Sequence, residues 1–202
     1  MPLFKTHRQA EVIAADSEDH DLARRLQSGD EFALNDIMRR YKERIYRFSW
    51  KYMGNEDAAL DVTQETFTKL YFNIEKFNPS YKFSTWVFQI AINLCRDHLR
   101  KNKHTLKDVS FDLLHEYGVK DWENSGENIE SAFQARQQLS LLQKEIDQLP
   151  SNLKEAFVLF ALEERPQSEC ADILGVSVKT VETRVYRARR ILMEKIDSPA
   201  EG

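Results

Sequence analysis

The sequence predicts an all-α protein in which two small helical domains are joined by a flexible acidic linker. Apolar residues recur at helical spacing along most of the chain, and no stretch is a strong candidate for a strand. Residues 108–130 hold seven acids and one Lys, a composition that favours little fixed structure. We therefore expect a tail at residues 1–18, a first domain at 19–102, the linker at 103–131, a second domain at 132–197 and a final tail at 198–202.

Composition limits the class of protein. The 202 residues suffice for two small domains with real cores, and 31% of them are charged. No apolar run approaches the ~20 residues of a membrane span, and the start has no export signal. The two cysteines, Cys95 and Cys170, lie far apart and fit a reducing compartment. We expect a cytoplasmic protein without membrane insertion, whose net charge of −4 leaves room for local basic patches.

Four helices are expected in the first domain. The second of them has apolar residues at i, i+3, i+4 and i+7 and is closed by Gly54-Asn55. A loop that contains Asn78-Pro79-Ser80 separates the last two. The expected ranges are a short helix ending at 28–30, a long helix over about 34–52, a helix over about 57–73 and a helix over about 85–101.

The helix over 57–73 has two contrasting faces. At about 100° per residue, apolar side chains gather on one arc, and acids and amides gather opposite without any base. The commoner explanation is a solvated face, and the alternative is a docking surface for a basic partner. The polar face consists of Asp57, Asp61, Gln64, Glu65 and Thr68.

The loop and the helix after it interleave aromatic and basic residues. Such a mixture suits unstacked nucleotides, whose bases stack on rings while cations hold the backbone. The aromatic rings could equally form core, and composition leaves the two interpretations even. The residues concerned are Phe72, Phe77, Tyr81, Phe83, Trp86 and Phe88, with Lys76, Lys82, Arg96, Arg100, Lys101 and Lys103.

The second domain has the layout of a helix-turn-helix. We expect helices over 168–174 and 178–196, with Gly175 in the turn and Ser177 as N-cap. Val178, Val181 and Val185 would hold the second helix, and upstream Asn152 and Glu155 would form a capping box. The exposed face of the second helix would contact base edges or nearby phosphates through Lys179, Thr180, Glu182, Thr183 and Arg184, and phosphates through Arg187 and Arg190.

No constellation of catalytic or metal-binding residues stands out. Cys95 and His98 are too few ligands for zinc, and there is neither a Ser/His/Asp arrangement nor a phosphate loop. We expect no enzyme activity, no metal and no cofactor.

Three motifs together resemble the extracytoplasmic-function (ECF) group of sigma factors in the sigma-70 family. Asp61-Val-Thr-Gln-Glu-Thr-Phe67 resembles that family's helix for binding core RNA polymerase. Residues 83–100 resemble its promoter-melting and −10 segment, and the helix-turn-helix with Arg187-Ala-Arg-Arg190 resembles its −35 region. The three occur in the family's order.

The resemblance implies partners and site residues. Core RNA polymerase would be bound through its clamp coiled coil, by Asp61, Gln64 and Glu65, and through its flap. A flipped base of the −10 element would be captured near the loop. The implied −10 contacts are Phe77, Tyr81, Lys82, Phe83, Trp86, Asn93, Arg96 and Arg100, and the exposed residues of the second helix would contact the −35 element.

One departure from the family suggests regulation. Leu60 stands where the family usually has an acid before Asp61, and Thr63 follows within a turn. Phosphorylation of Thr63 by a Ser/Thr kinase would add about −1.5 to −2 charge beside the acidic face. A half-buried Thr63 packed under that face is the alternative, and an anti-sigma factor could replace the kinase.

Two rival functions remain open at this point. A stand-alone helix-turn-helix regulator would need a ligand pocket or a dimer face in its first domain. A helical metal-dependent enzyme is the more distant possibility.

Overall fold

A computed structural model describes residues 16–102 and 141–197, and every regular element in these ranges is helical. The first half holds a helix over 16–27, α2 (Phe32–Met53), α3 (Glu56–Phe72), the 3-10 turn η1 (Ile74–Lys76) and α4 (Phe83–Asn102). The second half holds a helical segment over 141–147, α6 (Ser151–Phe157), the π-helical η2 (Val158–Leu162), α7 (Gln167–Leu174) and α8 (Val178–Asp197). The predicted all-α class is confirmed.

Several expected helix boundaries are confirmed at the residues that end or cap the helices. Gly54 ends α2 with a φ of 65°, and Asn55 caps α3 by accepting a hydrogen bond from the Ala58 amide at 2.8 Å. Gly175 ends α7 with the same left-handed φ of 65°. The helix over 16–27 begins before the expected tail ends, and α4 begins at Phe83 instead of Thr85.

Two local predictions for the second half are wrong. The capping box of Asn152 and Glu155 does not form, because α6 begins directly after Pro150 and has no side-chain cap. Val178 does not hold α8 to its neighbour, since its side chain is 41% exposed while Val181 and Val185 are buried.

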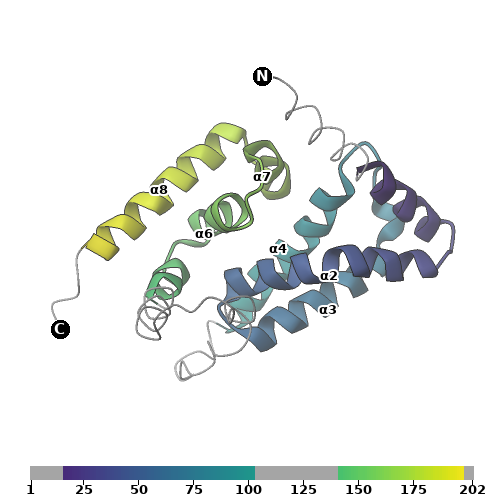
Figure 1. Cartoon of the computed structure of the whole chain (residues 1–202), viewed down its shortest axis with the longest axis horizontal. Coiled ribbons are helices and arrows are strands. Elements are labelled where there is room, and N and C mark those ends of the chain that lie inside the picture. The colour runs from purple at the N-terminus through teal and green to yellow at the C-terminus, as the bar shows by residue number, and fades with distance from the viewer. Residues whose placement is uncertain (1–15, 103–140, 198–202) are drawn as a thin grey trace, which may run out of the picture.

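The core runs through both halves. α2, α3 and α4 pack on one another, and α6, α7 and α8 form the second group (Figure 1). α4 also contacts α7, and α2 contacts η2, so the halves lie against each other with α8 on the outer side (Figure 1). The apolar face predicted for α3 is buried as expected, with Ala59, Phe67 and Leu70 at its centre.

Several predicted segments lie outside the described residues: the acidic linker, residues 132–140, the first 15 residues and the last five. Within the described part of the chain, no helix is long and apolar enough to cross a membrane.

Candidate interface with polymerase and promoter DNA

The polar face of α3 is open to solvent. Asp61, Gln64 and Glu65 are exposed, whereas Val62 and Thr66 on the same helix are buried. Together with Thr68, the three exposed side chains line a shallow pocket closed on its far side by His98 and Lys101 of α4. Only Glu65 has a base on its own helix, because Lys69 Nζ lies 3.3 Å from its Oε1. The face therefore offers carboxylates and an amide to a basic partner.

Thr63 lies beneath this face. Its side chain is 3% exposed, and its hydroxyl donates a 2.7 Å hydrogen bond to the Ala59 carbonyl one turn earlier. The alternative of a Thr packed under the docking face therefore describes its position in this structure. Leu60, by contrast, is 40% exposed and lines a groove between α2 and α3 with Met38 and Tyr46.

The aromatic residues of the loop divide into core and surface. Phe77 and Phe83 are buried, with ring centroids 5.1 Å apart in an edge-to-face arrangement, and Trp86 packs on both. In this conformation neither buried ring offers a face to a nucleotide, so we assign Phe77 and Phe83 to the floor under the loop.

The loop's surface candidates are Tyr81 and Lys82. Tyr81 is 65% exposed, and its carbonyl lies 2.9 Å from His20 Nε2. Lys82 is also exposed, and its Nζ lies 3.0 Å from Asp16 Oδ2. The loop thus offers one accessible ring and one accessible cation at consecutive positions.

The polar candidates of α4 differ in their availability. Asn93 and Arg100 are exposed, and Arg100 Nη2 lies 2.9 Å from Asp97 Oδ1 on the same helix. Arg96 instead reaches across to α6, where its guanidinium donates to both oxygens of Glu155 at 2.7 and 2.8 Å. These hydrogen bonds raise the pKa of Arg96 above its ordinary value. A DNA contact by Arg96 would compete with a bidentate ion pair.

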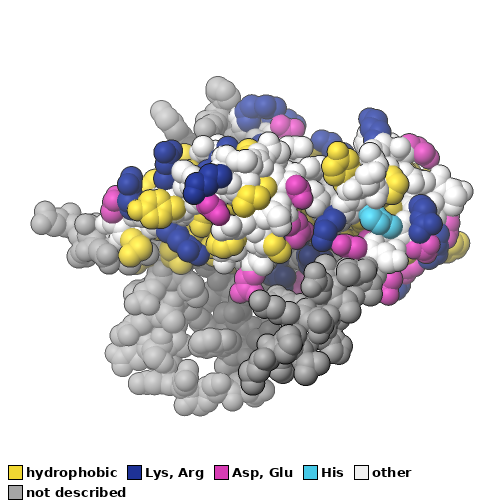
Figure 2. Space-filling model, turned by 90° about the horizontal axis from the view of Figure 1, so that it is seen from above, with side chains coloured by type: hydrophobic (Ala, Val, Ile, Leu, Met, Phe, Trp, Pro, Cys, Tyr) yellow, Lys and Arg dark blue, Asp and Glu magenta, His cyan; other side chains and the backbone are white. Residues whose placement is uncertain are grey.

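The second helix of the helix-turn-helix presents the predicted basic face. Ser177 Oγ accepts a 3.2 Å hydrogen bond from the Thr180 amide, which confirms the N-cap. No acid among residues 16–102 and 141–195 forms an ion pair with Arg184 or Arg187, while Lys179 and Arg190 have only exposed partners on their own helix. Figure 2 shows Lys and Arg side chains among hydrophobic ones at the end of the molecule where α8 lies.

Sequence reasoning missed three charged residues at the junction of the two halves. Lys154, Glu155 and Arg165 are each 5% exposed or less. Arg165 stacks on the Phe88 ring with Cζ 3.5 Å from the centroid, and burial lowers its pKa. No sequence signal placed them at this junction, because their partners Arg96, Phe88 and Tyr52 lie roughly 60 to 100 residues away.

Among residues 16–102 and 141–197, no three or more His, Cys, Asp or Glu side chains lie together in a group that could hold a metal ion. Cys95 and Cys170 are both buried free thiols, and burial raises the pKa of each to about 12.

Comparison with known proteins matches this arrangement to one family. The family models Sigma-70 region 2 and Sigma-70, region 4 match residues 37–105 and 139–192. The ECF RNA polymerase sigma factor SigW of Bacillus subtilis is 31% identical over 86% of this chain and 94% of its own length. The ECF RNA polymerase sigma-E factor of Haemophilus influenzae is 29% identical over 91% of this chain and 98% of its own.

Solved structures show the same fold. CnrH, in a complex with the cytosolic domain of CnrY, has a TM-score of 0.66 and 26% identity, covering 91% of this chain and 99% of CnrH. RpoE of Bartonella quintana, in a complex with the anti-sigma factor NepR, has a TM-score of 0.60 and 19% identity, covering 81% of this chain and 96% of RpoE.

These matches place the all-helical chain, with its basic helix-turn-helix, in the class of DNA-binding transcription initiation factors. More particularly, the chain belongs to the sigma-70 family, in its ECF group. We refer below to residues 37–102 as region 2 and to residues 141–192 as region 4.

Proposed function

We propose that this protein is an alternative, non-enzymatic initiation subunit that binds core RNA polymerase in the cytoplasm and directs it to a stress- or signal-responsive set of promoters. The observation that carries the proposal is the exposed acidic face of α3, formed by Asp61, Gln64 and Glu65, in one chain with a basic helix-turn-helix. Acids aimed at a basic coiled coil of the polymerase clamp give charge complementarity, which sets the orientation and rate of docking. Region 4 would contact the flap of core RNA polymerase.

Promoter contacts divide between the two regions. The −10 element is contacted by exposed and half-buried residues of the loop and α4, around the buried rings of Phe77 and Phe83. The N-terminal half of α8 enters the major groove at the −35 element, and its later arginines hold phosphates. The −10 residues are Tyr81, Lys82, Trp86, Asn93, Arg96 and Arg100, and the −35 residues are Lys179, Thr180, Glu182, Thr183, Arg184, Arg187 and Arg190.

A binding experiment with purified core polymerase tests the docking face. The double variant Asp61→Lys/Glu65→Lys should lose stoichiometric complex formation, since it opposes like charges at the clamp. Glu75→Lys changes an equally exposed acid away from this face and should bind normally. Absence of any complex with the wild-type protein would favour the stand-alone regulator, and stoichiometric metal in the purified protein would favour the enzyme.

Control of this docking face is the finer part of the proposal. Leu60 leaves the face one acid short, and a phosphate on Thr63 would supply charge beside Asp61. Because the Thr63 hydroxyl is buried and bonded to the Ala59 carbonyl, a kinase must act on a state in which α3 is locally loosened. Such local openings are part of the native ensemble.

Core-polymerase affinity of three proteins tests this control. Thr63→Glu should bind more tightly than the wild type, and Thr63→Ala should not, because only Glu adds charge. Equal affinities for all three would refute phosphorylation as the switch. In that case an anti-sigma protein is the alternative, since CnrH and the Bartonella RpoE were each solved with a bound partner protein.

A further inference from the structure

We propose that the free protein inhibits itself by closing region 4 onto region 2, with Glu155 of α6 occupying Arg96 of α4. The inference rests on the proposed function, because it assigns Arg96 to the −10 element. The two guanidinium–carboxylate hydrogen bonds of 2.7 and 2.8 Å engage both Glu155 oxygens. The Tyr52 hydroxyl adds a third contact to Glu155 at 3.3 Å. A phosphate at this place would have to displace a buried carboxylate.

At the junction of the two halves, two cationic side chains lie over aromatic rings. Lys154 Nζ lies 5.2 Å from the Tyr52 ring centroid, and the Arg165 guanidinium covers Phe88. Arg165 Nε is buried without a hydrogen-bond partner among the described atoms. Buried ions contribute little net stability, because each regains its hydration when it is exposed. The junction thus combines these charged contacts with the apolar core that runs through both halves.

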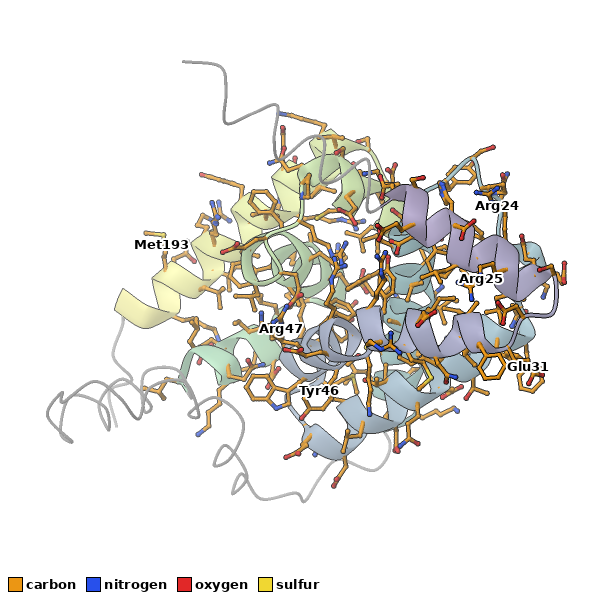
Figure 3. All side chains as sticks on the ribbon, turned by 45° about the vertical axis from the view of Figure 1, so that its right-hand side comes forward. Arg24, Arg25, Glu31, Tyr46, Arg47 and Met193 are labelled. Atoms are coloured by element: carbon orange, nitrogen blue, oxygen red, sulfur yellow. The ribbon has the colours of Figure 1, made fainter. Side chains whose placement is uncertain are left out.

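Further contacts cross the junction at several places. Lys51 Nζ of α2 lies 2.8 Å from Glu163 Oε1 and 2.6 Å from the Leu162 carbonyl, and Gln89 Nε2 of α4 donates to the Asp172 carbonyl at 2.8 Å. Arg47, labelled in Figure 3, lies on the same side of α2, with its Nε 3.9 Å from Glu163 Oε1. The contacts span α2, α4, α6 and α7, so closure involves the whole edge of region 2.

The position of Arg96 on its helix explains why closure affects DNA binding. At about 100° per residue, Gln89, Asn93, Arg96 and Arg100 all fall within an arc of roughly 60° on α4, with Arg96 at one edge and Asn93 at the other. Region 4 therefore covers the flank of the −10 face and takes Arg96 from it, while it leaves Asn93 and Arg100 exposed. A DNA strand along this face would also meet the negative charge of Glu155.

The −35 face is not covered in the same way. Arg187 and Arg190 are exposed residues of α8, and α8 itself lies on the outer side of the molecule (Figure 1). The closed chain thus keeps one DNA surface open and obstructs the other. Its apparent affinity for a −10 strand is lowered in proportion to the fraction of open molecules.

Fluorescence energy transfer between the halves measures closure independently of function. Dyes are attached at Glu75→Cys and Met193→Cys, which are exposed, while the native thiols Cys95 and Cys170 are buried. Glu155→Gln should broaden the distance distribution of the free protein. Glu145→Gln is the matched control, because Glu145 pairs with Lys195 of α8 at 2.6 Å and not with any residue of region 2.

Binding of DNA supplies the second readout. The probe is the labelled non-template strand of a promoter that the wild-type holoenzyme transcribes in vitro. Free Glu155→Gln should bind it about fivefold or more tightly than the wild type or Glu145→Gln, as expected for a larger open fraction. A disulfide-containing bifunctional thiol reagent that bridges Gln89→Cys and Asp172→Cys should abolish this binding until it is reduced.

The outcomes separate the two proposals. Unchanged energy transfer in Glu155→Gln, or full −10 binding by the cross-linked protein, overturns self-inhibition even when the protein supports transcription. A wild-type protein that closes but neither binds core polymerase nor supports transcription overturns the proposed function, and closure then has no inhibitory meaning.

Discussion

Single residues on α3 set how strongly the docking face can act. Leu60 exposes apolar surface at the place where one more carboxylate would extend the row begun by Asp61. Its neighbours in the α2–α3 groove include Arg39 and Lys42, so an acid introduced there has bases nearby. The charge of the face is therefore adjustable at one position.

Leu60→Glu should strengthen binding to core polymerase by about 1–3 kcal/mol if the new carboxylate is desolvated against a base of the clamp. The measurement is a titration of labelled protein with core enzyme. Phe72→Glu, which places the same acid on an exposed position at the other end of α3, should leave the affinity unchanged. Equal gains for both variants would indicate a general charge effect.

The buried thiol of Cys95 makes stability depend on alkaline pH. Burial raises its pKa to about 12, whereas a thiol in an unfolded chain titrates near ~8.5. Above that value the unfolded chain loses its proton first, so the contribution to the free energy of unfolding is complete below about pH 8.5. It is then lost as the pH rises toward 12.

Urea unfolding at pH 8 and pH 10 measures this effect. The wild type should lose about 2 kcal/mol more between the two pH values than Cys95→Ala, which has no thiol to titrate. An identical loss in both proteins would assign the alkaline sensitivity to other groups, such as Tyr41 and Tyr52, whose pKa values burial also raises.

At the scale of elements, two glycines end helices with the same backbone angle but different surroundings. Both Gly54 and Gly175 have a φ of 65°, which L-residues other than glycine adopt at a cost. A Cβ on Gly175 meets nothing within 4 Å. A Cβ on Gly54 lies 2.7 Å from Asp147 Oδ2, and Asp147 in turn holds buried Lys154 through a 2.8 Å ion pair.

Gly175→Ala should therefore lower the free energy of unfolding by about 1–2 kcal/mol, the cost of the left-handed conformation alone. Gly54→Ala should cost about 1–2 kcal/mol more, because displacing Asp147 leaves Lys154 poorly paired. Chemical denaturation of both variants checks the order. Equal losses would mean that Asp147 moves aside freely.

At the scale of the whole molecule, several polar contacts join the two regions, and the Arg96–Glu155 pair is the bidentate one among them. Removing Arg96 leaves Glu155 buried without its cation. Arg100 lies one turn further along α4, but its partner Asp97 is on the same helix and partly exposed. The two arginines thus form a matched pair.

Arg96→Ala should lower the free energy of unfolding by about 1–3 kcal/mol, or split the thermal transition into two as the regions separate. Arg100→Ala should change it by less than about 0.5 kcal/mol, as expected for an exposed pair. Calorimetry distinguishes the two outcomes. Similar small effects of both substitutions would show that the Arg96–Glu155 pair does not hold the regions together.

The sequence alone determined the helices, the caps at Asn55 and Ser177, the left-handed glycines and the two faces of α3, because these depend on residues within a few turns of one another. It also identified the family, since three local motifs occur in order. Only the tertiary structure decided that the rings of Phe77 and Phe83 are buried beneath the loop and that the Thr63 side chain is buried beneath the acidic face. It alone also decided that Glu155 pairs with Arg96. Burial and ion pairing of this kind join residues far apart in the chain, so no local pattern encodes them.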